Sequence, residues 1–213
     1  MIKLLILDLD GVIFDTERNM IKSWNEVRKK HGISKKFEDY RKNIGLPFFK
    51  ILKNLKIKKN QKNIQKKYKY YSIKNNDKIK LFPKVKSTLN KLKKVYLLAV
   101  VTSKDYDRTI KLIKKYKLPL KYISCPKKNL RGKPFPDQIN YIMKKINFKN
   151  RSEVAYVGDT KYDYMSAKKA KVNFIHASYG FEKKIKGLKT SINNFFEIID
   201  YLNERKWTEN NSR

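Results

Sequence analysis

Two aspartates, two residues apart, begin the part of the sequence whose side chains could do chemistry. Asp8 and Asp10 follow residues 2–7, a short and mostly apolar stretch that is typical of a buried parallel strand. Side chains at positions i and i+2 of a strand point the same way, so the two carboxylates would repel each other. A bound cation removes that repulsion, and phosphoryl transfer needs a cation of this kind. The pair therefore predicts Mg²⁺-supported phosphoryl transfer.

Three later motifs carry the groups that the aspartate pair lacks. They are, in chain order, Thr102-Ser103, Gly132-Lys133-Pro134 and residues 158–163 with the pattern GDTKYD. Hydroxyls can hold phosphoryl oxygens, an ammonium can balance their charge, and further carboxylates suit Mg²⁺, which prefers oxygen ligands. Each motif follows a predicted strand, and ligands of parallel sheets bind beyond the carboxyl ends of the strands. We therefore expect the four segments to converge on one site.

Each side chain of these motifs has a predicted role. Asp8 is the candidate nucleophile, since a carboxylate that attacks phosphorus divides one difficult displacement into two easier ones. Asp10 is placed to protonate the leaving alkoxide and later to accept a proton from the attacking water. Lys133 would balance the charge of the nucleophile and of the phosphate. The candidate positions for binding the substrate phosphate are Leu9, Gly11, Thr102, Ser103 and Lys133.

The candidate metal ligands are all aspartates. Asp8 and Asp159 can supply carboxylate oxygens to Mg²⁺, and the backbone carbonyl of Asp10 is a plausible third ligand. Asp163 lies one helical turn beyond Asp159, so it can either reach the same metal shell or orient Lys133.

Composition limits the class of protein. The chain has 213 residues, of which 40% are hydrophobic, enough for one large domain or for a core domain with a small insertion. No apolar run is long enough to span a bilayer, so no membrane partner is expected. The single cysteine, Cys125, excludes an internal disulfide and predicts a reducing, cytoplasmic location.

The net charge is unusually high, at +34. Such a charge is typical of proteins that bind nucleic acid or anionic membranes. However, only eight of the 53 basic residues are arginine, and the lysines are spread along the chain. Proteins that bind nucleic acid usually contact phosphate through arginine. The excess of lysine therefore favours compositional bias, rather than a nucleic-acid groove, as the origin of the charge. The field would still draw anionic substrates towards an open cleft.

Periodicity predicts an α/β fold, a Rossmann-like doubly wound parallel sheet with an inserted α-helical cap. Helical spacing dominates residues 17–82, whereas strands and helices alternate elsewhere. The expected catalytic core is residues 1–14 and 83–206, the cap is residues 15–82, and residues 207–213 form a polar, frayed tail. The expected core strands are residues 2–7, 95–101, 122–124, 154–157 and 172–176. The expected core helices are residues 85–93, 106–116, 137–146, 162–170 and 195–202.

The motifs resemble those of the haloacid dehalogenase-like hydrolase superfamily. Residues 8–16 are similar to its first motif, residues 101–104 to its second, residues 132–137 to its third, and Asp159 with Asp163 to its fourth. The resemblance covers residues 2–181. The insertion resembles the helical cap of the phosphoglycolate phosphatase and β-phosphoglucomutase branch, which closes over the core and selects the substrate. In that branch the position of Thr16 lies near the hinge.

Details of the resemblance favour a phosphatase. The superfamily's phosphoryl-transfer members carry the second aspartate of the first motif, here Asp10, and the fourth motif has the Gly-Asp-x-x-x-Asp form of phosphatases. Residues 179–181 resemble the loop after the last core strand of phosphoglycolate phosphatases. By location, Asn43 and residues 45–48 are candidates for the cap loop that faces the substrate. Lys171 departs from the pattern, because the family usually has glycine there.

The sequence thus predicts a Mg²⁺-dependent phosphatase that hydrolyses a small phosphate monoester through an aspartyl-phosphate at Asp8. Phosphoglycolate, a sugar phosphate and a nucleoside monophosphate all remain open as the phosphorylated metabolite, and so does the oligomeric state. One alternative is a phosphomutase of the β-phosphoglucomutase type, in which a sugar hydroxyl replaces water. Another is a nucleic-acid-binding protein whose active site is vestigial.

Overall fold

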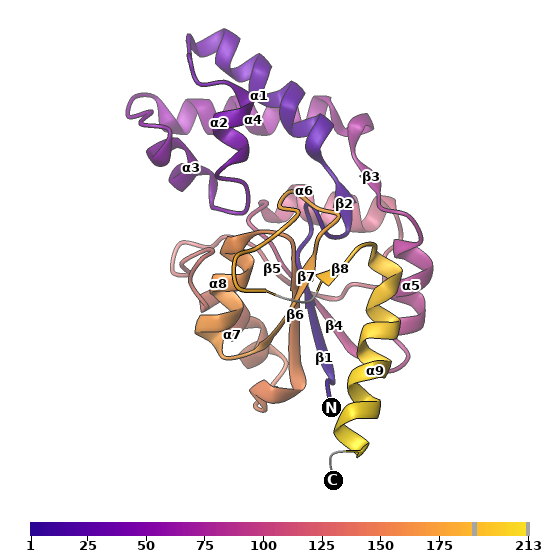
Figure 1. Cartoon of the computed structure of the whole chain (residues 1–213). Coiled ribbons are helices and arrows are strands. Elements are labelled where there is room, and N and C mark those ends of the chain that lie inside the picture. The colour runs from indigo at the N-terminus through magenta and orange to yellow at the C-terminus, as the bar shows by residue number, and fades with distance from the viewer. Residues whose placement is uncertain (189–190, 212–213) are drawn as a thin grey trace.

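The centre of the protein is a six-stranded parallel sheet. A computed structural model describes residues 1–188 and 191–211 (Figure 1). The strand order is β5-β4-β1-β6-β7-β8. The strands are β1 (Leu4–Leu7), β4 (Leu97–Val101), β5 (Tyr122–Ser124), β6 (Val154–Gly158), β7 (Asn173–Ala177) and β8 (Ser191–Ile192). The chain runs outward from β1 to β4 and β5, then returns to place β6 on the other side of β1. The strand order therefore reverses beside β1, where open α/β sheets bind ligands.

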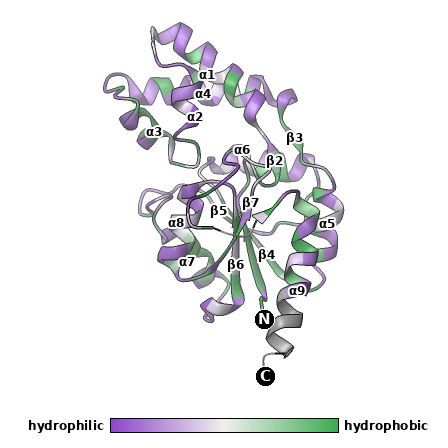
Figure 2. Ribbon diagram, in the orientation of Figure 1, coloured by the Kyte–Doolittle hydropathy of each residue, from purple (hydrophilic) through white to green (hydrophobic). Residues whose placement is uncertain are grey.

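The central strands are apolar because helices cover both faces of the sheet. All residues of β1 and β6 are buried, and alternate side chains of β1 enter different cores. Leu5 and Leu7 pack with α5 (Val85–Leu92), α6 (Tyr106–Lys115) and α9 (Ile198–Asn211). Leu4 and Ile6 pack with α7 (Asp137–Lys145) and α8 (Lys161–Ala170). Figure 2 shows these apolar strands between helices whose outer faces are hydrophilic.

A second group of helices lies over the carboxyl edge of the sheet, at the end of the molecule opposite the N-terminus (Figure 1). This helical unit comprises α1 (Glu17–His31), α2 (Phe37–Arg41), α3 (Phe48–Asn54), α4 (Gln61–Lys74) and the short 3₁₀ turn η1 (Asn76–Lys78). It has its own aromatic core, in which the ring of Tyr40 lies 4.8 Å from that of Trp24 and 5.7 Å from that of Tyr68. The chain enters and leaves the unit through an antiparallel pair, β2 (Phe14–Asp15) and β3 (Lys80–Leu81).

The predicted fold class is confirmed, while three local predictions need correction. We expected no strand in residues 17–82, yet β3 lies there. The strand β8 was not expected either. Each of these strands has only two residues, which is too few to show the alternating pattern of a strand. The closing helix was expected at residues 195–202, but after the 3₁₀ turn η3 (Phe195–Glu197) α9 runs to Asn211. Residues 207–211 of the predicted tail are therefore helical, and residues 212–213 lie outside the described residues. A further 3₁₀ turn, η2 (Arg151–Glu153), precedes β6.

Within the described part of the chain, no helix combines the length and the apolar character needed to cross a membrane.

Candidate active site

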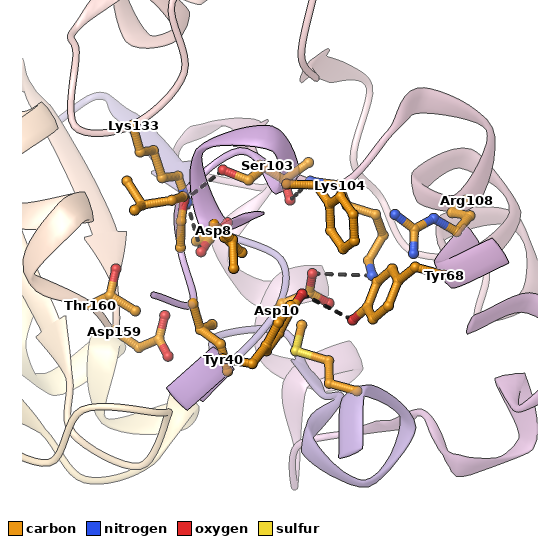
Figure 3. Close-up of a pocket in the computed structure, with 17 residues that line it drawn as sticks. Asp8, Asp10, Tyr40, Tyr68, Ser103, Lys104, Arg108, Lys133, Asp159 and Thr160 are labelled. Atoms are coloured by element: carbon orange, nitrogen blue, oxygen red, sulfur yellow. Dashed lines mark hydrogen bonds and ion pairs between the residues drawn. The ribbon is translucent and has the colours of Figure 1, made fainter. Parts of the chain in front are cut away.

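The predicted motifs meet in one cavity between the sheet and the helical unit (Figure 3). The strand ends explain this convergence: Asp8 follows β1, Thr102 follows β4 and Asp159 follows β6. The core side of the cavity is lined by Asp8, Asp10, Thr102, Ser103, Lys104, Arg108, Lys133, Asp159 and Thr160. The predicted site residues Leu9, Gly11 and Asp163 do not line the cavity. The sequence therefore predicted most of the core half of the cavity.

Lys133 is a buried cation held between two carboxylates. Its Nζ lies 2.8 Å from Oδ2 of Asp8 and 2.6 Å from Oδ1 of Asp163. Burial by itself would lower the pKa of Lys133, but the two carboxylates outweigh it and raise that pKa above its usual range. Lys133 is therefore a permanent positive charge beside the candidate nucleophile.

Asp163 has both carboxylate oxygens occupied by protein donors. Besides Lys133, its Oδ1 accepts a hydrogen bond from the Tyr156 hydroxyl at 2.6 Å. Its Oδ2 accepts bonds from the backbone and the side chain of Thr160, at 3.0 and 2.6 Å, which caps α8. Burial opposes ionisation, yet Lys133 and these donors lower the pKa of Asp163. Of the two roles predicted for Asp163, the geometry favours orienting Lys133.

The carboxylates of Asp8, Asp159 and Asp163 form a group that fits a metal ion. One oxygen from each lies within 4.8 Å of the others. Oδ2 of Asp159 accepts a hydrogen bond from the Phe181 amide at 2.7 Å, whereas its buried Oδ1 has no partner among the described residues. Burial raises the pKa of Asp8 to about 7, although Lys133 lowers it, and raises the pKa of Asp159 well above its usual value. Carboxylate oxygens clustered in this way could hold a metal ion that prefers oxygen ligands.

Asp10 lies outside this group of three and pairs with a lysine. Oδ2 of Asp10 is 3.1 Å from Nζ of Lys104, while its Oδ1 is buried without a partner in the described chain. Burial lowers the pKa of Lys104, and Asp10 opposes that effect. The Asp10 side chain is thus not among the clustered carboxylates, which leaves its backbone carbonyl as the predicted ligand atom. Sequence reasoning gave Lys104 no role, although it follows Ser103 in the second motif.

Three of the predicted phosphate-binding groups already have other partners. The Leu9 amide donates to Oδ1 of Asp8 at 2.7 Å, and the Gly11 amide donates to the Phe14 carbonyl at 2.9 Å. The Ser103 hydroxyl donates to the Gly45 carbonyl of the helical unit at 2.6 Å. In this conformation these three donors do not point at a phosphate.

The Thr102 hydroxyl can donate a hydrogen bond to a ligand in the cavity. Its Oγ1 accepts a hydrogen bond from the Lys104 amide at 3.1 Å and donates to no group in the described part of the chain, so the hydroxyl proton can be donated into the cavity that Thr102 lines. The Thr102 carbonyl accepts a bond from the buried Gln138 side chain at 3.0 Å, which fixes the loop after β4. Gln138 is a positioning group that the sequence analysis missed, because nothing in a single sequence distinguishes it from a surface glutamine.

The helical unit supplies the other half of the cavity. Its lining residues are mostly aromatic or aliphatic: Met20, Tyr40, Ile44, Gly45, Leu46, Phe48, Ile51 and Tyr68. The Tyr40 hydroxyl donates to that of Tyr68 at 3.2 Å (Figure 3), and burial raises the pKa of Tyr68 to about 12, so this hydroxyl stays neutral. Of the candidate cap-loop positions, Gly45, Leu46 and Phe48 line the cavity; Asn43 instead accepts a bond from Asn54. Tyr40 and Tyr68 were missed as lining residues because the helical unit's docking decides which faces meet the core.

Solved structures with the same fold come from several bacteria. A hydrolase from Pseudomonas syringae is 22% identical, with a TM-score of 0.84 over 95% of this chain and 98% of that one. A predicted phosphoglycolate phosphatase from Haemophilus somnus is 21% identical, with a TM-score of 0.82 over 94% and 98%. CbbY from Rhodobacter sphaeroides, in complex with phosphate, is 19% identical, with a TM-score of 0.78 over 93% and 96%.

Sequence comparison identifies the family. No curated protein matches the chain significantly. The family profile described as haloacid dehalogenase-like hydrolase matches residues 5–177, which is most of the chain and includes all four motifs. The chain therefore belongs to the haloacid dehalogenase-like hydrolase family.

Proposed function

We propose that this protein is a Mg²⁺-dependent phosphatase that hydrolyses a small phosphate monoester through an aspartyl-phosphate at Asp8. The observation that carries the proposal is the buried arrangement of Asp8 and Asp163 on either side of Lys133, next to the unpartnered oxygen of Asp159. Relatives of the same fold include a predicted phosphoglycolate phosphatase and a protein bound to phosphate, which agrees with this chemistry.

Asp8 attacks phosphorus and Lys133 supports the attack. The carboxylate forms the new oxygen–phosphorus bond while the bond from phosphorus to the leaving alkoxide breaks. Lys133, 2.8 Å from Asp8, favours the ionised nucleophile and then faces the transferred group's oxygens. Asp163 keeps Lys133 in this position. Thr102 donates its free hydroxyl proton to a phosphoryl oxygen.

Asp8, Asp159 and the backbone carbonyl of Asp10 are the groups that would hold Mg²⁺. When bound, the ion neutralises charge on the phosphoryl group and on the clustered carboxylates. The unpartnered Oδ1 of Asp159 supports this assignment, because a buried carboxylate oxygen without a donor is costly.

Asp10 moves the protons. In its protonated form it gives a proton to the leaving alkoxide, and as a carboxylate it takes one from the water that hydrolyses the aspartyl-phosphate. Water attack releases inorganic phosphate and restores Asp8. Among the described residues Oδ1 of Asp10 has no partner, since the ion pair with Lys104 is made by Oδ2, and Oδ1 can therefore serve in this exchange.

The helical unit is the substrate-selecting cap in this proposal. We assign residues 15–82 to the cap and residues 1–14 and 83–206 to the catalytic core, with the β2–β3 pair at the junction. Tyr40, Phe48 and Tyr68 face the leaving group from the cap, and Arg108 faces it from α6. A cavity with charged groups on its core side and mostly apolar groups on its cap side suits a small phosphorylated metabolite.

The test is phosphate release from a panel of phosphorylated metabolites, with and without Mg²⁺. We expect wild-type protein and Asp200→Asn, a control at an exposed position of α9, to turn over one substrate class only with Mg²⁺. Asp8→Asn keeps the side-chain size and should lose turnover. Equal release by wild-type protein and Asp8→Asn would refute the proposal.

The same panel separates the alternatives. Transfer of labelled phosphate to a second hydroxyl of a sugar, with no free phosphate, would identify a phosphomutase. Tight and steeply salt-dependent binding to DNA or RNA without any turnover would identify a nucleic-acid-binding protein.

A further inference from the structure

Phe181 contacts both the candidate metal site and the helical unit. It lies in the loop between β7 and β8, and its amide donates a hydrogen bond to Oδ2 of Asp159 at 2.7 Å. Its carbonyl accepts a bond from Nη2 of Arg41 at 3.3 Å. Its ring is buried in the hydrophobic cluster of the helical unit, whose other buried members all lie between Met20 and Tyr68. One residue of the core is thus anchored at three points.

The loop that contains Phe181 packs so closely against Asp159 that no additional side-chain atom fits between them. A Cβ atom on Gly180 would collide with the Asp159 side chain and with the Gly11 carbonyl. A Cβ atom on Gly11 would collide with the Asp159 carboxylate and with the Phe181 ring. Because the two glycines allow this close contact, Phe181 cannot shift without displacing Asp159.

The hydrogen bond from Phe181 also sets the direction of Asp159. With Oδ2 held by the Phe181 amide, the rotation of the carboxylate is fixed, and Oδ1 is the oxygen left without a partner in the described chain. On the other side, Arg41 of α2 pairs with Glu17 of α1 at 2.8 Å. The Phe181 carbonyl is therefore tied to two helices of the helical unit.

We propose that Phe181 is a positioning residue that couples the docking of the helical unit to the orientation of Asp159. Mg²⁺ binding and docking of the helical unit then strengthen each other, because coupling between two binding events is reciprocal. The inference rests on the proposed function in that Asp159 is taken as a metal ligand.

The first experiment measures Mg²⁺ affinity without substrate, by isothermal titration calorimetry. We expect Phe181→Ala to bind Mg²⁺ about tenfold more weakly, the size of effect typical of groups that orient metal ligands. Phe181→Leu keeps an apolar side chain in the cluster and should restore most of the affinity. Phe37→Ala is the matched control, since Phe37 is buried in the same cluster but forms no recorded bond to Asp159.

Amide hydrogen exchange gives a second readout. Mg²⁺ should slow exchange of residues 37–48 in wild-type protein and in Phe37→Ala, and should have no such effect in Phe181→Ala. If Phe181→Ala does not fold, Arg41→Met replaces it, with Glu17→Gln as its control. Arg41→Met removes the bond to the Phe181 carbonyl, whereas Glu17→Gln leaves that bond in place.

The outcomes separate the coupling from the metal assignment. Equal Mg²⁺ affinity of wild-type protein and folded Phe181→Ala would overturn the coupling and leave the proposed function standing. An equal loss in Phe181→Ala and Phe37→Ala would also overturn it, since general loosening of the cluster would then explain both. Wild-type protein that binds no Mg²⁺ would overturn the coupling together with the metal assignment.

Discussion

Lys104 places its ammonium nitrogen 3.1 Å from Oδ2 of Asp10, in a site where the two side chains are 4% and 14% exposed. A buried ion pair of this kind couples the charges of its members, since removing one leaves the other unpaired in a poorly solvated place. Asp10 must change its charge during the proposed reaction. Lys104 therefore helps to hold the Asp10 carboxylate in place beside the cavity that both residues line.

Lys104→Met tests this relationship. Without the ion pair the Asp10 carboxylate is no longer held in place beside the cavity, so both of its proton transfers become less efficient. We expect kcat to fall about 10- to 100-fold, the cost typical of losing a partner that orients a functional side chain. Steady-state kinetics on the substrate class identified by the panel measures this change. Lys86→Met, at an exposed position of α5, is the control, and an unchanged kcat would contradict the prediction.

The raised pKa values of Asp8 and Asp159 predict how Mg²⁺ stabilises the protein. Both groups hold their protons more tightly in the folded protein than at the ordinary value of 3.8. As pH rises from about 4 towards 7 the unfolded chain releases these protons first, so the metal-free folded state loses stability. Mg²⁺ binds the ionised carboxylates. The increase in Tm caused by Mg²⁺ should therefore be larger at pH 7.5 than at pH 5.5. An increase at pH 7.5 that is equal to or smaller than that at pH 5.5 would contradict this prediction.

Asp159→Asn removes one of the clustered charges. At pH 7.5 the metal-free variant should be more stable than wild-type protein by about 1–3 kcal/mol, because a buried carboxylate lacking full compensation is replaced by a neutral amide. The same variant should lose the Mg²⁺-induced rise in Tm. Chemical denaturation with and without Mg²⁺ checks both effects, with Asp200→Asn as the control. A destabilised metal-free variant would show that Asp159 is adequately paired.

The parts of the site that could be predicted from the sequence are those that follow strands. The buried strands β1 and β6 are continuous apolar runs, and each ends directly at an aspartate, Asp8 or Asp159. Parallel strands bring such ends together whatever the surroundings are. Lys133 could be identified because it stands between Gly132 and Pro134 ahead of a helix.

The contacts that could not be predicted depend on how the helical unit docks. The Ser103 hydroxyl meets a carbonyl 58 positions earlier in the chain, and Phe181 packs among helices that lie far away in sequence. Periodicity indicates which face of a helix is buried but not which loop it meets. For the same reason the sequence predicts that Ser103 binds the phosphate, and it predicts no role for Phe181 beyond its loop.

Lys171 adopts a conformation that glycine would adopt more easily. It ends α8 with φ 55° and ψ 40°, in the left-handed region, at the position where the family usually has glycine. That conformation costs a non-glycine residue about 1–2 kcal/mol, whereas glycine adds about 0.5–1 kcal/mol of chain entropy to be lost on folding. Lys171→Gly should therefore raise Tm by about 1–4 °C. Lys168→Gly, inside α8, should lower it, and a lower Tm for Lys171→Gly would contradict the argument.

The Ser103 hydroxyl donates to the Gly45 carbonyl at 2.6 Å, so it holds the helical unit against the core. Ser103→Ala should weaken docking by the value of one hydrogen bond, about 0.5–1.5 kcal/mol, and raise KM about 2- to 12-fold. kcat should stay close to that of wild-type protein, because the hydroxyl does not face the reacting phosphate. Ser87→Ala removes a comparable hydroxyl from α5, where it donates to the Lys84 carbonyl, and should change neither constant. A fall in kcat with unchanged KM would instead place the Ser103 hydroxyl on a phosphoryl oxygen in the transition state, the role that the sequence alone predicts.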